Sequence, residues 1–325
     1  MKTAVLCFSP QGAALAKEYF SEADLFGKDF QRPAKKEDFG SIFSGYDRIV
    51  FIGAAGIAVR YMAPFVEDKR KDPAVVVIDP MGRYVIPILS GHLGGGNGYA
   101  VELAKAMGAE AVLTTASDSL GFEAIDVFAQ KENYAFEDMV AMKEVAAAMV
   151  AGREIPWYSE EDALPSYTHI KRVESIEAAD VKEGVVVTTK DVEIKRGLQL
   201  VPRRIHLGIG SKKNTDPEAL VALIKKTLKT YAIHPMALSA IHTIDIKKEE
   251  AAILYAAKQL NLPLKIYTAE ELSKNDDRCS GSDFVKATVG VSSVSCTAAF
   301  MGGEEMIAEK IAEAGLTLSI TKEAR

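Results

Sequence analysis

Short apolar segments alternate with helical segments along this chain, and this alternation restricts the possible folds more than any other feature of the sequence. Segments with the length and apolar content of buried strands lie at residues 3–8, 48–52, 75–78, 85–89 and 111–114. Helical patterns follow several of them, at residues 13–20, from Ile57 onward, and at 99–107. Helices placed between successive strands imply crossover connections, which join parallel strands. The pattern predicts an α/β fold with mostly parallel sheets.

The same alternation resumes near Val201, after a less regular stretch. Strand-like segments lie at residues 205–209, 240–246 and 264–267, and Asp216-Pro217 is typical of a helix start, with Asp as N-cap. Residues 130–200 are largely polar, apart from a helical segment at 136–150 and a β-branched one at 185–189. We therefore expect two α/β units joined by a less regular central region. The expected boundaries are an N-terminal domain with glycine-rich loops over 1–130, a central variable region over 131–200 and a C-terminal domain over 201–325.

Charge and cysteine content exclude several classes of protein. The 45 acidic residues outnumber the 39 basic ones, which argues against a general nucleic-acid binder. No run of 18 apolar residues occurs, and the first apolar run is too short for a signal peptide. Cys7, Cys279 and Cys296 are odd in number and form no C-x-x-C pair, which argues against a disulfide framework or a structural zinc site. The expectation is a reduced cytoplasmic protein that binds neither nucleic acid nor membrane.

The densest chemical signal is the segment SGHLGGGN at residues 90–97. Its four glycines, between a strand and a helix, predict a turn with bare backbone N–H groups, which attract anions. His92 is the residue of this turn that can exchange a proton near neutral pH. The alternative is a tight turn whose histidine bonds to a loop carbonyl. The predicted site residues here are Gly91, His92, Gly94, Gly95, Gly96 and Asn97.

Two further strand ends carry candidate binding residues. Gly53 and Gly56 flank a helix start, and Arg60 lies one turn into that helix, within reach of a ligand carboxylate. Their G-A-A-G spacing does not match the dinucleotide fingerprint, and close strand–helix packing is the alternative. The segment TTASD supplies Thr114, Thr115 and Asp118 at a strand end, where doubly wound sheets bind ligands. These three could equally cap the next helix.

Cations gather at the start of the C-terminal unit. Arg203, Arg204, Lys212 and Lys213 fall within eleven residues, with no acid before Asp216. Such a cluster beside a glycine-flanked loop favours a ligand bearing carboxylates or phosphates, although a solvated basic turn is the alternative. The predicted binding residues of this unit are Arg203, Gly208, Gly210, Ser211, Lys212, Lys213, Thr215 and Lys247.

Several signatures of catalysis are missing from the sequence. There is no H-E-x-x-H pattern and the five histidines lie far apart, so we expect no metal held by the protein. There is no G-x-S-x-G elbow, and Cys296 has no histidine partner in the sequence. Cys296 is therefore expected to line the core.

Taken together, these segments resemble the cobalt-precorrin-5A hydrolase family of anaerobic cobalamin biosynthesis. The resemblance spans most of the chain and is weakest over residues 130–200. One position departs from the family pattern, because Cys296 stands where members often carry an acid. The matching segments, in family order, are IGAAGIAVRYMAPFVEDKRKDPAVVVID, GRYVIPILSGHLGGGN, TTASD, LGIGSKKNT, TIDIKKEEA and VGVSSVSCTAA.

The resemblance implies both an activity and a domain plan. The plan is an N-terminal domain, a variable middle and a C-terminal domain that elsewhere occurs as a separate protein. The implied reaction hydrolyses the δ-lactone of cobalt-precorrin-5A and releases a two-carbon fragment as acetaldehyde, giving cobalt-precorrin-5B. The substrate is an anionic cobalt-tetrapyrrole that brings its own cobalt, so no cofactor is expected. Its acetate and propionate groups suit Arg60, Arg203, Arg204, Lys212 and Lys213.

These residues give a mechanistic hypothesis with open alternatives. His92 would activate water, the N–H groups of residues 94–97 would stabilise the oxyanion, and the macrocycle would lie in a cleft between the two α/β units. Asp245 is the alternative base. A non-catalytic tetrapyrrole-binding or handover protein and a nucleotide-dependent oxidoreductase are the alternative functions. A homodimer and transient contacts with neighbouring pathway enzymes complete the expectations.

Overall fold

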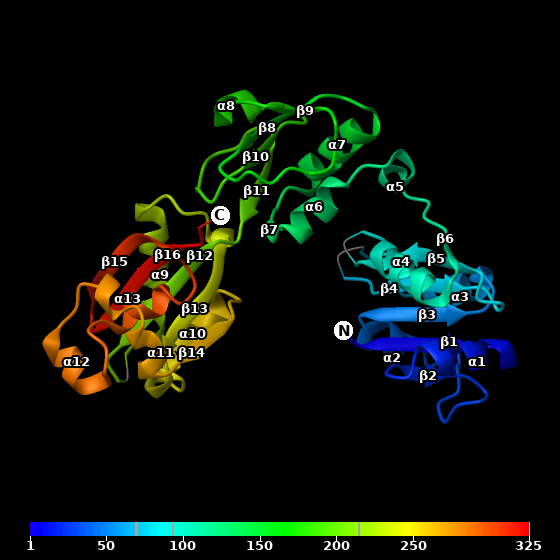
Figure 1. Ribbon diagram of the computed structural model, residues 1–325, viewed down its shortest axis with the longest axis horizontal. Helices are drawn as coiled ribbons and strands as arrows, with labels where there is room; N and C mark the ends of the chain where they lie inside the picture. The colour runs from blue at the N-terminus through cyan, green and yellow to red at the C-terminus, as the bar shows by residue number, and fades with distance from the viewer. Residues whose placement is uncertain (69–70, 93, 214, 325) are drawn as a thin grey trace. The chain divides into compact units, whose positions relative to one another are not determined.

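The computed structural model describes residues 1–68, 71–92, 94–213 and 215–324, whose contacts divide the chain into two compact units. The first unit comprises Met1–Gln130 with Pro165–Tyr167, and the second comprises Lys131–Leu164 with Thr168–Arg325. Over the described ranges, three mixed, mostly parallel sheets interleave with helices, one sheet in the first unit and two in the second (Figure 1). The predicted α/β class is confirmed.

The first unit is built on a six-stranded sheet of order β2-β1-β3-β4-β5-β6. Neighbouring strands are parallel except β4 and β5, which form an antiparallel hairpin around Asp79. The strands are β1 (Thr3–Cys7), β2 (Asp24–Phe26), β3 (Arg48–Ile52), β4 (Ala74–Ile78), β5 (Tyr84–Leu89) and β6 (Glu110–Ala111). The helices are α1 (Pro10–Tyr19), α2 (Phe39–Gly45), α3 (Ala55–Met62), α4 (Gly96–Met107), α5 (Ala116–Leu120) and α6 (Ile125–Lys131).

Both faces of this sheet are buried, as its continuous apolar strands require. Along β3, Ile49 and Phe51 join an aromatic core with Phe39, while Val50 and Ile52 join a second, aliphatic core on the other face. This alternation follows from the two-residue period of a strand. The β3–α3 and β5–α4 connections therefore start from rigid strands, and they carry the predicted glycine turns.

The central residues form a small sheet of their own, where we expected less regular structure. Its order is β7-β11-β10-β8-β9, with β7 antiparallel and the others parallel. Its strands have two to five residues, too few for a clear period-two pattern between polar loops. The elements are β7 (Tyr134–Ala135), α7 (Met139–Val150), β8 (Ile155–Ser159), β9 (Ile170–Arg172), α8 (Ile176–Ala179), β10 (Val185–Val187) and β11 (Leu198–Pro202).

The C-terminal sheet has the order β14-β13-β12-β16-β15 and ends in an antiparallel hairpin. Asp216 caps α9 by accepting the N–H of Glu218, as predicted, and Leu220 and Ile224 of that helix enter the core. The strands are β12 (Ile205–Ser211), β13 (Leu238–Ile244), β14 (Leu264–Tyr267), β15 (Glu305–Glu313) and β16 (Leu316–Lys322). The helices are α9 (Pro217–Thr230), η1 (Pro235–Ala237), η2 (Asp245–Lys247), α10 (Ala251–Gln259), α11 (Ala269–Ser273), η3 (Asp276–Arg278), α12 (Asp283–Val289) and α13 (Val294–Ala299).

A disulfide joins Cys279 to Cys296, so the expectation of reduced cysteines is wrong for this pair. The odd count misled because one cysteine, Cys7, stays free and buried while the other two pair. Burial raises the pKa of the Cys7 thiol to about 12, which makes it unreactive. Cys296 is fully buried, as expected of a core residue. A search of the helices in the described ranges finds none long and apolar enough to span a membrane.

Candidate functional site

His92 lies between two carboxylates in the first unit. Its Nδ1 is 3.2 Å from Oδ1 of Asp126, and its Nε2 is 3.8 Å from Oδ2 of Asp118. The hydroxyl of Ser117 is closer to Nε2, at 3.3 Å. A carboxylate beside Nδ1 favours the tautomer that carries its proton there. In that tautomer Nε2 of His92 is the unprotonated nitrogen, which can accept a proton from a substrate or from water.

The segments at 90–97 and 114–118 meet at this histidine, as their strand-end positions suggested. The side-chain amide of Asn97 donates to Oδ2 of Asp118 at 2.8 Å and to Oγ1 of Thr115 at 2.9 Å, and the Thr115 hydroxyl also bonds to Asp118. A side chain on Gly91 would collide with the Asn97 amide, so the turn requires glycine there. Four predicted site residues are thus brought together: His92, Asn97, Thr115 and Asp118.

The glycine turn does not expose its backbone donors in the way the sequence suggested. The amide of Gly95 donates to the His92 carbonyl at 2.8 Å, that of Gly96 to Ser90 at 3.1 Å, and that of Asn97 to Gly91 at 2.8 Å. The expectation of bare amides is therefore wrong for these three residues. Left-handed backbone at Ser90 and Gly95 folds the turn back onto its own carbonyls. Leu93 of this segment lies outside the described residues.

Sequence reasoning missed two members of the centre, Ser117 and Asp126. Ser117 belongs to the TTASD segment, whose hydroxyls could orient a substrate, but it was not among the predicted site residues. Asp126 is nearly buried, with 10% of its side chain exposed, near the start of α6. In the sequence, Asp126 is flanked by the apolar residues Ile125, Val127 and Phe128. This is the signal that could have revealed it, since a carboxylate buried with such neighbours requires a partner.

The other candidates in this unit do not join the His92 centre through any contact found in the described ranges. Gly53 is buried and its amide donates to Ile78 at 2.9 Å, which fits the packing alternative. Gly56 and Arg60 are exposed on α3, where the guanidinium donates to the Gly56 carbonyl at 3.3 Å. Thr114 is exposed ahead of α5. The binding roles of Gly56, Arg60 and Thr114 remain predictions.

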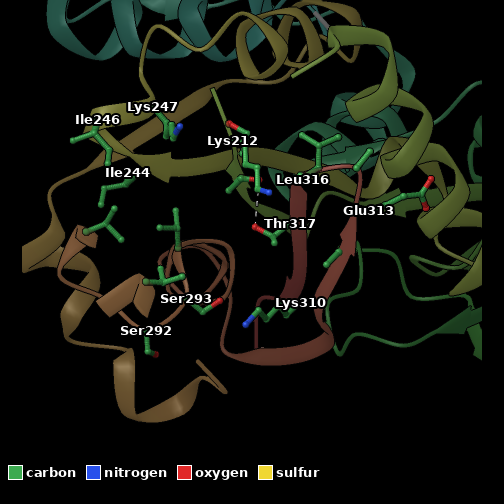
Figure 2. Close-up of a pocket in the computed structure, with 18 residues that line it drawn as sticks. Lys212, Ile244, Ile246, Lys247, Ser292, Ser293, Lys310, Glu313, Leu316 and Thr317 are labelled. Carbon is green, nitrogen blue, oxygen red and sulfur yellow. Dashed lines mark hydrogen bonds between the residues drawn. The ribbon is translucent and has the colours of Figure 1, made fainter. Parts of the chain in front are cut away.

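A cavity of about 470 Å³ opens in the C-terminal sheet, at the ends of β12 and β13 (Figure 2). This volume is within the range of small-molecule sites. Three lysines line the cavity, from three different segments: Lys212, Lys247 and Lys310. The buried hydroxyl of Ser211 in its wall has no hydrogen-bond partner within the part of the chain described. Cations and an unsatisfied donor together suit a carboxylate-bearing ligand.

Half of the predicted C-terminal binding residues line this cavity: Gly210, Ser211, Lys212 and Lys247. Thr215 supports the loop instead, by donating its hydroxyl to the Lys212 carbonyl at 2.8 Å. Lys213 and Arg203 are exposed and lie outside the lining. Asp245, the alternative base, starts η2 beside the cavity wall but does not line it either.

Two predictions in this unit are corrected by burial. Gly208 lies beneath α13, where an added side chain would collide with the backbone of Ser295 and Ala299, so it serves packing rather than ligand binding. Arg204 is 2% exposed, and its guanidinium forms a two-point pair with Glu161, through Nε at 3.0 Å and Nη2 at 3.2 Å. It is therefore unavailable to a substrate. Glu161 lies 43 residues from Arg204 in the chain, so a local sequence pattern could not predict this pair.

Two histidines expected to lie far apart meet on adjacent strands. The Nδ1 of His206 on β12 is 2.9 Å from Nε2 of His242 on β13. His206 also contacts Oε1 of Glu323 at 2.9 Å, and His242 contacts the Tyr267 hydroxyl at 3.0 Å. Burial, with smaller effects of His206 and Lys265, lowers the pKa of His242 to about 3. No cluster of three or more potential metal ligands forms among the described residues.

The depressed pKa of His242 predicts acid sensitivity. As pH falls, the unfolded chain takes up this proton near pH 6.5, whereas the folded chain does so only near pH 3. Stability should therefore fall from pH 7 to pH 5, by about 1–2 kcal/mol for this one group. Urea unfolding at both pH values should show a smaller pH effect in His242→Gln. An equal pH effect in the wild type and in His242→Gln would contradict this assignment.

Comparisons with known proteins match nearly all of the chain. Three family models match in succession: "Cobalamin synthesis G N-terminal" over residues 37–118, "Cobalamin biosynthesis central region" over 123–202 and "Cobalamin synthesis G C-terminus" over 205–321. A cobalt-precorrin-5A hydrolase of Salmonella typhimurium strain LT2 is 33% identical, covering 98% of this chain and 96% of its own. One from Priestia megaterium is 30% identical, covering 86% and 79%. A solved cobalamin biosynthesis protein G homolog from Sulfolobus solfataricus is 22% identical, covers 99% and 97%, and has a TM-score of 0.40.

Proposed function

We propose, since this chain belongs to the cobalt-precorrin-5A hydrolase family, that it opens the δ-lactone of cobalt-precorrin-5A and releases a two-carbon fragment as acetaldehyde, giving cobalt-precorrin-5B. Membership makes the chain a hydrolase of cobalamin biosynthesis. The observation that supports the chemical step is the imidazole of His92, oriented by the nearly buried carboxylate of Asp126 at 3.2 Å. Such a pair is suited to moving a proton during attack on a carbonyl.

In the proposed reaction, Nε2 of His92 serves as the proton acceptor. In the net reaction, oxygen from water becomes bonded to the lactone carbonyl carbon, and the bond from that carbon to the ring oxygen breaks. The proton taken up by His92 passes to the departing oxygen, so the imidazole returns to its neutral form. Asp126 stabilises the transient imidazolium, as a carboxylate beside Nδ1 does in other hydrolases. The product is a free carboxylic acid, which precedes loss of the two-carbon fragment.

The lysine-lined cavity of the second unit is proposed to hold peripheral carboxylates of the macrocycle. Acetate and propionate groups need cations and hydrogen-bond donors, which Lys212, Lys247 and the Ser211 hydroxyl provide. The apolar part of the wall, including Ile244 and Val289, would face the hydrocarbon of the ring substituents. Cobalt enters with the substrate in this proposal, and the protein supplies no cofactor.

Incubation with cobalt-precorrin-5A tests the proposal directly. Formation of one acetaldehyde per macrocycle, with the corresponding loss of mass from the ring, is the expected result. Binding without aldehyde would contradict hydrolysis and favour the handover function, which the separate lysine-lined cavity could also serve. Absence of both binding and aldehyde would contradict both functions.

Replacing Lys212 by Gln should raise KM for cobalt-precorrin-5A about tenfold and leave kcat nearly unchanged. A charge-assisted hydrogen bond contributes about 1.5 kcal/mol, which corresponds to that factor. The KM of Lys212→Gln should also depend less on salt, because one screened charge pair is lost. Lys225→Gln, an exposed position on α9 outside the cavity, is the matched control. Equal KM values for the two variants would remove the cavity from substrate binding.

A further inference from the structure

Three side chains of the first unit stand in the order serine, imidazole, carboxylate. The Ser117 Oγ is 3.3 Å from Nε2 of His92, and the opposite ring nitrogen is 3.2 Å from Asp126. This arrangement activates serine for acyl transfer in several unrelated folds, and it is identified by geometry rather than by sequence order. The chain has no nucleophile-elbow motif, which is why only the structure brings the three together.

The other polar group near Nε2 is poorly placed to compete with Ser117. Oδ2 of Asp118 is 3.8 Å from Nε2, beyond hydrogen-bond distance. That oxygen already accepts hydrogen bonds from the Asn97 amide and the Thr115 hydroxyl. Its lone pairs are therefore committed to the scaffold. The Ser117 hydroxyl, at 3.3 Å, is placed to donate to Nε2, as a nucleophile and its base require.

We infer that Ser117 is the nucleophile of the lactone-opening step, an inference that rests on the proposed function for its substrate. The Ser117 Oγ bonds to the lactone carbonyl carbon while its proton moves to Nε2 of His92. The bond from that carbon to the ring oxygen then breaks, and His92 returns the proton to this oxygen. The macrocycle is now an ester of Ser117. Water attacks that ester, gives its proton to His92 and releases the carboxylic acid, while the serine regains its proton.

The burial of Ser117 is consistent with a first attack on the lactone by this serine, followed by attack of water on the ester. Ser117 is 5% exposed, whereas 23% of the His92 side chain is exposed. A serine held by its base in a partly dry site is oriented before the substrate arrives, which lowers the entropic cost of attack. Direct attack by water would not need a hydroxyl at this point of the site. The two routes differ in one observable, the covalent ester on Ser117.

Single-turnover reactions of the full chain with cobalt-precorrin-5A distinguish the two routes. Ser117→Ala should slow acetaldehyde release about 10³-fold or more, without weakening macrocycle binding. Neutral hydroxylamine should intercept the ester and give a macrocycle hydroxamate faster with the wild type than with Ser117→Ala or without enzyme, where only direct attack on the lactone forms it. Ser119→Ala, an exposed serine of the same helix, is the matched control. A Ser117→Ala rate within about threefold of that control, or hydroxamate formed no faster with the wild type than with Ser117→Ala, overturns the inference.

A fluorophosphonate probe separates failure of this inference from failure of the proposed function. The probe phosphonylates activated serines without needing the macrocycle, and peptide mapping should place it on Ser117. Labelling should disappear in His92→Ala and persist in Ser119→Ala. If labelling occurs but cobalt-precorrin-5A is not consumed, the substrate assignment fails and the nucleophile stands. If the wild type releases acetaldehyde while Ser117→Ala does so equally fast, only the nucleophile fails.

Discussion

Replacing His92 by alanine is expected to slow acetaldehyde release from cobalt-precorrin-5A by about 10²–10⁴-fold, the usual contribution of a positioned general base. The imidazole is the group that carries the proton in each step derived above, and the Asp126 carboxylate, 3.2 Å from its Nδ1, orients it. Affinity for the macrocycle should not change, because His92 contributes to the reacting centre and not to the lysine-lined cavity. Single-turnover release, measured with enzyme in excess, separates the chemical step from binding.

Asp245→Asn should be measured beside His92→Ala, because Asp245 was the alternative base in the sequence. Its carboxylate is placed at the start of η2 and outside the cavity lining, and no side-chain hydrogen bond or ion pair of Asp245 is found in the described ranges. We therefore expect Asp245→Asn to retain most of the wild-type rate. A near-wild-type rate for His92→Ala together with a large loss for Asp245→Asn would exchange the two roles.

The parts of the fold predicted from the sequence are those with dense local signals. The strand over residues 48–52 was located to the residue, because four successive apolar positions, 49–52, lie between Arg48 and Gly53. The start of α9 was located because Asp216 and Pro217 have conformational preferences of their own. The β-branched segment at 185–189 indicated β10, but the rest of the central sheet escaped prediction, because short strands such as β9 have no measurable period. Pairing in that sheet depends on neighbours that lie far away in the chain.

The candidate site likewise contains some residues that the sequence predicted and others that it did not. His92 and Asp118 were found because strand ends in α/β folds bring such residues together. The carboxylate that orients the imidazole was not found, since Asp126 lies 34 positions beyond His92 and belongs to a helix rather than a strand end. The amide donors of the turn were wrongly predicted, because the left-handed residues that close it leave only a weak mark in the sequence. The sequence shows which chemical groups are present, whereas the distances between these groups in the folded chain determine which of them can act together.

Glu161→Ala is expected to lower the free energy of unfolding by up to about 3–5 kcal/mol, because the buried Arg204 loses its two-point partner and keeps only the more distant Glu323 carboxylate at 3.8 Å. The side chains of Arg204 and Glu161 are 3% and 6% exposed, so water cannot replace the lost carboxylate. Tyr134 also donates its hydroxyl to Glu161 at 2.6 Å and would lose that acceptor. Trp157, the one tryptophan of the chain, is buried in β8 of the same unit. Its fluorescence during urea unfolding therefore reports on this unit.

Glu160→Ala is the matched control for this measurement, because it removes a neighbouring carboxylate whose partner, Lys190, is 59% exposed. Exposed pairs contribute about 1 kcal/mol or less, so the two variants should differ severalfold. Replacing Arg204 and Glu161 together by Met should recover most of the loss, since no charge then remains buried. Equal losses in Glu161→Ala and Glu160→Ala would mean that the guanidinium reaches solvent at little cost. Arg204 would then be available to bind an anionic substrate, as the sequence analysis predicted.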